Sequence, residues 1–154
     1  MNCIYGSIIS ILPVVEVRGS IPYLISMGCS YLYIILSYFL STMTGIIVYF
    51  LIEEILKLAR AFLSRFWKGG EAILNKIIER TERKASEKIE KYGTIGLIIF
   101  VAIPLPGTGV WTGALAGYLL GLRARDVIIA LVIGNAIATL LVSLAASGIA
   151  IALK

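Results

Sequence analysis

Two stretches of this sequence carry no charge over a length that would cross a membrane, and they constrain the fold more than any other feature. Residues 31–52 give 22 uncharged residues and residues 127–153 give 27. A helix of 22 residues is about 33 Å long, and the apolar core of a bilayer is about 30 Å thick. The composition agrees, since 59% of the residues are hydrophobic and only 15% are charged. The chain is therefore predicted to be an all-α integral membrane protein with spans at 31–52 and 127–153.

The charged residues are concentrated between the two predicted spans. Residues 53–91 hold ten Lys or Arg and seven Asp or Glu, which is 17 of the 23 charges in the chain. Basic residues gather in the cytoplasmic loops of membrane proteins, so this segment is expected to be cytoplasmic. Its apolar residues recur at helical spacing before Lys68-Gly69-Gly70, and a more charged helix is expected from Glu71 to Lys91, which predicts an amphipathic helical region. The net charge of +5 is explained by this orientation signal and indicates no nucleic-acid partner.

Several classes of enzyme are excluded by residues that the chain lacks. It has no histidine and a single aspartate, Asp126, so Ser-His and Cys-His nucleophile pairs and an aspartate-pair protease are excluded. It contains no phosphate-binding loop of the G-x-x-x-x-G-K-[ST] type that would power a nucleotide-driven pump. We expect no enzyme activity, no catalytic residue, no cofactor and no metal site. The two cysteines, Cys3 and Cys29, do not establish a redox compartment.

The other two apolar stretches, 3–28 and 92–121, are each interrupted by proline and glycine. The first is broken between Pro13 and Pro22, and the second from Pro104 to Gly109. The unbroken arms have about 9–16 residues, or about 14–24 Å of helix, which is too short to cross a bilayer. Each stretch is predicted to be a re-entrant hairpin that enters and leaves the membrane on one side. The alternative is a single kinked spanning helix in each case.

The placement of charge favours the hairpins. With two hairpins the chain crosses the membrane twice, so Arg123 and Arg125 share the face of segment 53–91. With two kinked spans instead, these arginines lie on the opposite face, against the positive-inside rule.

The two halves of the chain have the same order of features. A shift of 93 positions places Pro13 on Pro106, Gly28 on Gly121 and one uncharged span on the other. Because one span lies between them, the hairpins would enter from opposite faces, which gives the inverted repeat of many secondary transporters. The predicted organisation is a single membrane domain, 1–154. It has repeat 1 at 1–52, cytoplasmic amphipathic helices at 53–91 and repeat 2 at 92–154.

The sharpest candidate site is the first break, where Glu16 and Arg18 are the only charged side chains before residue 53. Inserting a charged side chain at the centre of a membrane costs about 2.5–3.5 kcal/mol on insertion scales. An ionisable residue at that depth is therefore taken as a functional-site candidate. In extended backbone the two side chains would point the same way, whereas in a helix they would diverge. We expect them to bind a substrate or an ion, with Gly19 and Pro22 beside them. The alternative is a solvated pair near the membrane surface.

The second break has no charge, and its predicted role is to free backbone groups to face a cavity. Asn135 in the last span is either a binding residue or a hydrogen-bonding contact between helices. A stripe of glycines follows the break and predicts close packing against the other hairpin or a second protomer. The candidate binding residues of this half are Pro104, Pro106, Gly107, Thr108, Gly109, Trp111, Thr112 and Asn135, and the glycine stripe is Gly109, Gly113, Gly117 and Gly121.

The two breaks, EVRGSIP at 16–22 and PLPGTGVWTGA at 104–114, resemble the signature stretches of the small multi-drug export protein family. The resemblance covers essentially the whole chain. More distantly, the chain is similar to the DedA/VTT superfamily through Lys91-Tyr92-Gly93, a proline twelve residues after that tyrosine, and Ala116-Gly117. The resemblance implies two re-entrant hairpins and either lipid scrambling or ion-coupled transport. Where the DedA pattern has arginines, this chain has Val101, Ala102 and Gly107, which argues against a lipid phosphate as cargo.

The expected function is proton- or ion-coupled transport of a small or amphipathic solute across the cell membrane. Glu16 is the candidate ion carrier, and Arg18 would hold it charged or meet an anionic substrate group. One alternative is a lipid scramblase, and another is a non-transporting scaffold in which segment 53–91 docks a partner. Two spans and two hairpins enclose little volume, so a homo-oligomer in the lipid bilayer is expected.

Overall fold

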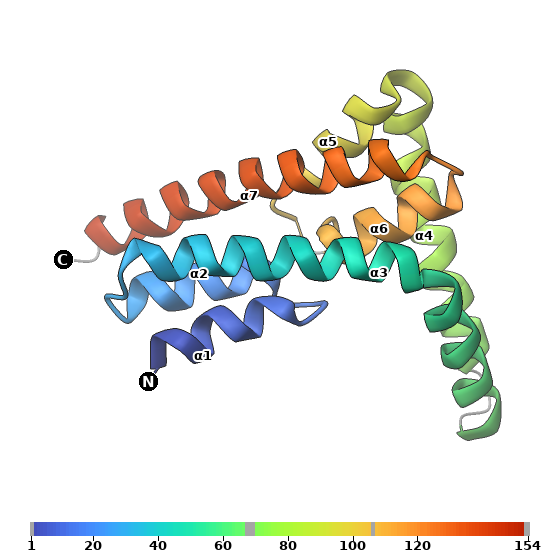
Figure 1. The fold of residues 1–154 in the computed structure, drawn as a ribbon, viewed down its shortest axis with the longest axis horizontal. Coiled ribbons are helices and arrows are strands. Elements are labelled where there is room, and N and C mark those ends of the chain that lie inside the picture. Colours follow the sequence, from blue (N-terminus) through green and yellow to red (C-terminus); the bar gives the residue numbers. More distant parts are fainter. Residues whose placement is uncertain (1, 67–69, 106, 153–154) are drawn as a thin grey trace.

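The computed structural model describes residues 2–66, 70–105 and 107–152, and within these ranges the chain is helical with no strand. Figure 1 shows the long helices α3 and α7 side by side and running in opposite directions, with the shorter helices packed around them. The all-helical fold class is confirmed. The elements are α1 (Asn2–Ile8), the 3-10 helix η1 (Ile9–Ile11), α2 (Glu16–Ser26), α3 (Tyr31–Phe66), α4 (Gly70–Tyr92), α5 (Thr94–Ala102), α6 (Val110–Leu119) and α7 (Ala124–Ala152).

α3 and α7 are long and apolar enough to cross a membrane, over Tyr31–Phe62 and Ala124–Ile149. The prediction that the first long helix ends at residue 52 is wrong, since α3 continues to Phe66. No glycine or proline lies between Gly45 and Phe66, so nothing in the backbone ends the helix where the charges begin. The last turns of α3 bend away from the bundle and lie beside α4, across the direction of the long helices (Figure 1).

The first broken stretch folds back on itself. α1 and η1 lead into a turn at residues 12–15, and α2 returns along α1. A disulfide joins Cys3 and Cys29 at the two ends of the stretch, with their Cα atoms 5.8 Å apart. A single helix over the same residues would separate these ends by about 39 Å. The stretch is therefore a helical hairpin.

Pro22 does not bound the break as the sequence predicted, because it lies inside α2. α2 begins at Glu16, so Arg18 and Gly19 are helical as well and the break is confined to residues 12–15. Proline lacks the N–H that would bond to the carbonyl of Arg18. The helix nevertheless continues for 11 residues, since its apolar side chains, such as Ile21, are fully buried and hold it in place.

The second broken stretch has the same form. α5 ends at Ala102, and α6 starts at Val110. Gly93 and Gly121 bound the stretch with φ of 55° and 63°, a conformation that favours glycine. α5 packs mainly against α7, whereas α6 packs mainly against α3, and α2 lies against both long helices. The two arms of this stretch are thus held by different long helices.

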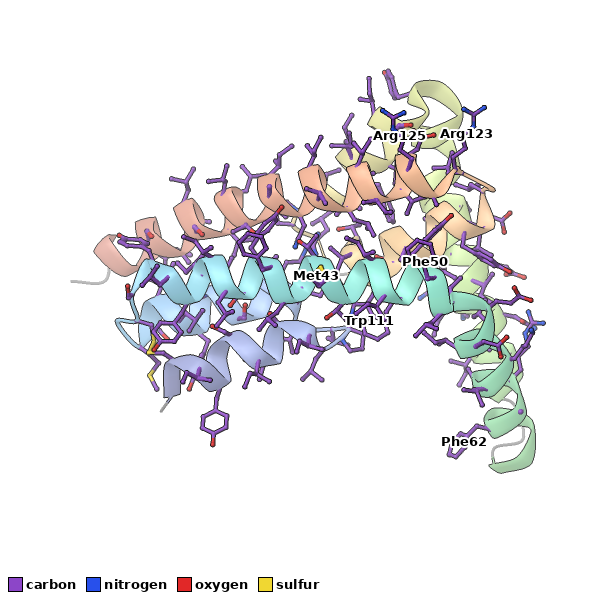
Figure 2. The ribbon with its side chains drawn as sticks, viewed as in Figure 1. Met43, Phe50, Phe62, Trp111, Arg123 and Arg125 are labelled. Atoms are coloured by element: carbon purple, nitrogen blue, oxygen red, sulfur yellow. A yellow bond between two sulfur atoms is a disulfide. The ribbon has the colours of Figure 1, made fainter. Side chains whose placement is uncertain are left out.

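The two ends of the bundle differ in charge. Figure 2 shows Arg123 and Arg125 at the end of the bundle where α4 and the last turns of α3 lie. The start of α1 and the end of α7 lie at the opposite end (Figure 1), where Figure 2 also shows the disulfide. The basic helices and the two arginines therefore share one end of the molecule, and the disulfide lies at the other.

The disulfide gives a direct test of the first hairpin. We expect Cys3 and Cys29 to be oxidised in native membranes, because their Cα separation of 5.8 Å lies within the range that a disulfide requires. Alkylation of denatured protein with a polymer-linked maleimide checks this. We expect two maleimide groups to be attached to each chain after reduction and none before it. Two additions without reduction would contradict the contact between the ends of the hairpin.

Candidate functional site

The first break places a carboxylate against the start of α6. Glu16 begins α2 and is only 3% exposed. Its Oε2 accepts a hydrogen bond from the backbone N–H of Val110 at 3.2 Å, and its Oε1 accepts one from the N–H of Trp111 at 3.2 Å. These are the first two residues of α6, whose N–H groups have no partner within the helix. The negative charge therefore caps the positive end of the α6 dipole.

Arg18 holds the other side of the second break. Its Nη1 donates to Glu16 Oε2 at 2.6 Å, which forms an ion pair. Its Nη2 lies within hydrogen-bond distance of three carbonyl oxygens, those of Val101 at 2.8 Å, Ile103 at 3.0 Å and Thr108 at 3.1 Å. The first two belong to the end of α5, where carbonyls lack helical partners. The ion pair thus supplies hydrogen-bond partners for backbone carbonyls at the end of α5 and for backbone N–H groups at the start of α6.

The loop between α5 and α6 is shaped to receive this pair. A Cβ at Gly109 would overlap the Glu16 carboxylate, so only glycine lets the carboxylate reach the α6 N–H groups. The Thr108 hydroxyl lies 2.6 Å from the carbonyl oxygen of Ile103 and 2.8 Å from that of Leu105, which closes the loop.

A further contact joins the two breaks. The indole N–H of Trp111 donates to the carbonyl of Ile11 at 3.2 Å, and Ile11 is the last residue of η1. The Thr112 hydroxyl donates to the carbonyl of Gly109 at 3.2 Å, within the first turn of α6. Two segments that are far apart in the sequence therefore meet at one place in the bundle.

Glu16 and Arg18 form their pair although both belong to a helix, where the sequence analysis expected them to diverge. Within the described ranges, Glu16 is the one non-glycine residue with a positive φ, at 44°. Because α2 starts from this left-handed conformation, the Glu16 side chain leaves the helical path and the long Arg18 side chain reaches it. Strain of this kind costs of order 1–3 kcal/mol and is concentrated at functional sites.

Comparison with known proteins assigns the chain to a family. The family model described as "Putative small multi-drug export protein" matches residues 16–141, from Glu16 to the middle of α7. The chain belongs to this family. No curated protein and no solved structure matches it. The family is one of export proteins and not of enzymes, and the two long apolar helices agree with a membrane protein. The more distant similarity to the DedA/VTT superfamily remains a prediction.

Other residues that the sequence singled out lie beside the ion pair or farther from it. Pro22 and Pro104 line a groove of about 430 Å³ between α2, the loop after α5 and α7. Gly19 allows a close approach to Val15, since a Cβ at Gly19 would lie 2.6 Å from Val15 Cγ1. Gly107 has a φ of 80° and faces open space. Pro106 lies outside the described residues.

The glycine stripe packs mainly within its own half of the chain. A Cβ at Gly113 would meet side chains of α5 and α7, and one at Gly117 would meet α7. Gly109 faces the other hairpin, through Glu16. Nothing within the chain lies within 4 Å of the Cβ position of Gly121, so packing of this glycine against a second protomer stays a prediction. Gly121 lies two residues after the end of α6, and its φ of 63° reverses the chain.

Asn135 makes a polar contact between the two long helices. It is fully buried in α7, and its Nδ2 donates to Thr42 Oγ1 on α3 at 2.9 Å. Its Oδ1 is buried and has no hydrogen-bond partner within the described part of the chain.

The sequence did not reveal the backbone groups that complete the site, because N–H and C=O groups carry no residue signature. One signal was available, since the shift of 93 positions aligns Glu16 with Gly109, the residue that its carboxylate contacts. In the segments that the structure describes, no three His, Cys, Asp or Glu side chains are grouped to hold a metal. The site offers one acid, buried between a cation and a helix end, whose protonation would change the charge at the junction of the two broken segments.

Proposed function

We propose that this chain is a proton-coupled exporter of a small or amphipathic solute, built as an inverted repeat of two re-entrant hairpins and two spans. The observation that carries the proposal is the buried ion pair of Glu16 and Arg18, which bridges the two helix ends of the second break. Secondary transporters bind ions and solutes where broken helices meet, and ionisable groups at that depth mark their ion pathways.

The helix boundaries support the inverted repeat. α7 begins at Ala124, 93 residues after α3 begins at Tyr31. Gly28 and Gly121 have the same separation, and both have a positive φ. α2 packs against α7 while α6 packs against α3, so the second arm of each hairpin rests on the long helix of the other half. Two halves related by a two-fold axis would exchange partners in this way.

Two contacts support the same relation. Thr42 and Asn135 are 93 positions apart and form a hydrogen bond at 2.9 Å. Glu16 and Gly109 are also 93 positions apart, and the carboxylate lies against the glycine. Residues related by a two-fold axis touch only where they lie beside it, so the proposed axis passes close to both pairs. The ion pair would then lie near the centre of the membrane, where the two hairpin tips meet.

Helix lengths and the disulfide support re-entry. α1, α2, α5 and α6 have 7, 11, 9 and 10 residues, so each is at most about 17 Å long and shorter than the bilayer core of about 30 Å. Disulfides form in oxidising compartments, which favours an outer-face location for Cys3 and Cys29. The basic residues of α4 and the two arginines before α7 lie at the opposite end and would face the cytoplasm.

Protonation of Glu16 is the proposed coupling step. A neutral carboxyl group no longer pairs with the Arg18 guanidinium, and it is a weaker acceptor for the N–H groups at the start of α6. The end of α5 and the start of α6 would then be less firmly held to α2. Because the ion pair spans both hairpins, adding one proton biases how the two hairpins sit against each other.

Transport into liposomes tests the proposal. The probes are ethidium, a cationic amphipath, and anilinonaphthalene sulfonate, an anionic one, each followed across an imposed pH gradient. We expect the gradient to drive the movement of at least one dye in the wild type and in Glu53→Gln. The Glu53 carboxylate is the matched control, since it is 62% exposed and pairs with Lys57 far from the junction. Glu16→Gln is expected to reduce the flux to that of protein-free liposomes.

The same liposomes separate the alternatives. Flipping of a fluorescent lipid without any gradient, measured by dithionite quenching, would favour a scramblase. No dye flux and no lipid flipping, with a protein partner captured through residues 53–91, would favour a scaffold. Equal flux in the wild type and in Glu16→Gln would contradict proton coupling through this site.

A further inference from the structure

An apolar groove lies close to the ion pair, one turn of α2 beyond Arg18. It has a volume of about 430 Å³, within the range of pockets that hold drug-sized ligands. α7 contributes most of its wall, through Leu141, Val142 and Ala146, and one proline from each broken stretch completes it, Pro22 and Pro104. The wall on α7 belongs to the half of that helix away from Arg123 and Arg125, so the groove lies in the half of the bundle that carries the disulfide.

Arg18 does not line this groove, but it lies next to two residues that do. It precedes Pro22 by one turn of α2, and its Nη2 contacts the carbonyl of Ile103, the residue before Pro104. Its side chain is 14% exposed, so the guanidinium is not sealed from its surroundings. Its Nε is buried and has no acceptor within the described chain. The Arg18 guanidinium, with one N–H donor unused, thus lies next to the apolar groove.

We propose that the groove binds an amphipathic molecule with one anionic group, and that this group pairs with Arg18 when Glu16 is protonated. The inference rests on the proposed function and names its substrate class. A proton adds to a carboxylate oxygen of Glu16, the Glu16–Arg18 ion pair opens, and the anion of the ligand takes the place of the carboxylate. The charge of the junction is the same before and after the exchange, which avoids leaving an unpaired cation in the membrane.

Among the residues that the structure describes, Arg18 is the one cationic side chain at the junction. η1, α5, α6, residues 31–52 of α3 and residues 127–149 of α7 carry no charged side chain, and these segments surround the junction. The polar contacts of the Glu16 carboxylate are Arg18 and the N–H groups of Val110 and Trp111. A single arginine suits one monovalent anion, while the groove, which is apolar apart from Ser26, suits an apolar body.

Two matched dyes test the substrate class without transport. Anilinonaphthalene sulfonate and phenylnaphthylamine share their aromatic rings, and only the first carries an anion. Binding to the protein in nanodiscs of uncharged lipid is measured by fluorescence against empty nanodiscs. In the wild type we expect the anionic dye to bind about tenfold more tightly at low pH than at high pH, as for one charge-assisted hydrogen bond. The neutral dye should bind equally at both.

Four variants show which residues the binding of the dyes depends on. Glu16→Gln should bind the anionic dye tightly at both pH values, and Arg18→Gln should bind it weakly at both. Ala146→Trp fills the groove and should weaken both dyes. Leu144→Trp is its control, because Leu144 is on the same helix, is 72% exposed and does not line the groove.

Equal binding of the two dyes at every pH would overturn the proposal and show that the groove holds only apolar chains, such as those of lipids. Unchanged binding in Ala146→Trp would overturn it by placing the dye elsewhere. If Glu16→Gln does not fold, two results still test the proposal. They are the pH dependence of anionic-dye binding to the wild type and the weak binding expected of Arg18→Gln. Because these are binding measurements, dye binding of the expected kind without any flux would reject the transport proposal alone.

Discussion

Replacing Gly109 with alanine is expected to cost about 3–5 kcal/mol of stability, the range for breaking a buried ion pair. The added methyl group would occupy the position of the Glu16 carboxylate, against which α2 and the start of α6 meet. The carboxylate would have to leave the N–H groups of Val110 and Trp111 and separate from Arg18. Thermal unfolding in detergent measures this, and a loss of about 10 °C in Tm is expected for a chain of this size.

Gly148→Ala is the matched control for this substitution. Gly148 lies in α7 with nothing within 4 Å of its Cβ position. Alanine is the better helix former, so this variant should unfold at the wild-type temperature or slightly above it. If Gly109→Ala unfolds together with Gly148→Ala, the carboxylate does not lie against Gly109 and the assigned junction is wrong.

Arg18→Gln is expected to have the second large effect, a loss of about 3–5 kcal/mol. Glutamine cannot neutralise the buried Glu16 carboxylate, and it cannot serve the carbonyls of Val101, Ile103 and Thr108 together. Arg18→Lys should lie between the wild type and Arg18→Gln, because it keeps the charge but lacks the planar fork of donors. Chemical denaturation in mixed micelles, followed by the fluorescence of tryptophan, measures the order of the three proteins.

The double variant Glu16→Gln/Arg18→Gln distinguishes the pair from the single side chains. It leaves no buried charge, so it should be more stable than the sum of the two single losses predicts. Additive losses would mean that Glu16 and Arg18 act independently. Lys57→Gln removes an exposed pair with Glu53 and serves as the control, for which little change is expected.

The sequence predicted the elements of this fold better than their contacts. The two long helices follow from uncharged runs that are long enough to span a bilayer. The two broken stretches follow from prolines and glycines that interrupt apolar sequence. The end of α3 was misplaced because a change from apolar to charged residues alters where a helix lies and not whether it continues. Pro22 was misplaced because burial of its neighbours on α2 outweighs one missing hydrogen bond.

The site was only half visible in the sequence for a physical reason. Glu16 and Arg18 are conspicuous because a charge in apolar sequence is costly. Their partners are backbone groups more than 80 residues away, and any residue type supplies the same N–H or C=O. The geometry of the pair also depends on a positive φ at a glutamate, which local propensity does not predict. Gly109 was singled out both as a binding residue and for helix packing, and in the structure it leaves room for the Glu16 carboxylate.

The central claim is that both broken stretches re-enter the membrane, so that Glu16 and Arg18 lie near its centre. Its most direct test is labelling of single cysteines by an impermeant maleimide in intact cells. Positions 57, 125 and 30 are introduced one at a time into a chain without Cys3 and Cys29. Residue 57 lies on the bent end of α3, residue 125 at the start of α7, and residue 30 between α2 and α3.

We expect protection at positions 57 and 125, relieved when the cells are lysed, and ready labelling at position 30. In the proposed topology the charged end of the bundle faces the cytoplasm and the disulfide end faces outward. Ready labelling at position 125 with protection at position 57 would contradict the account. The second stretch would then cross the membrane completely, and the meeting of two hairpin tips at Glu16 would be lost with it.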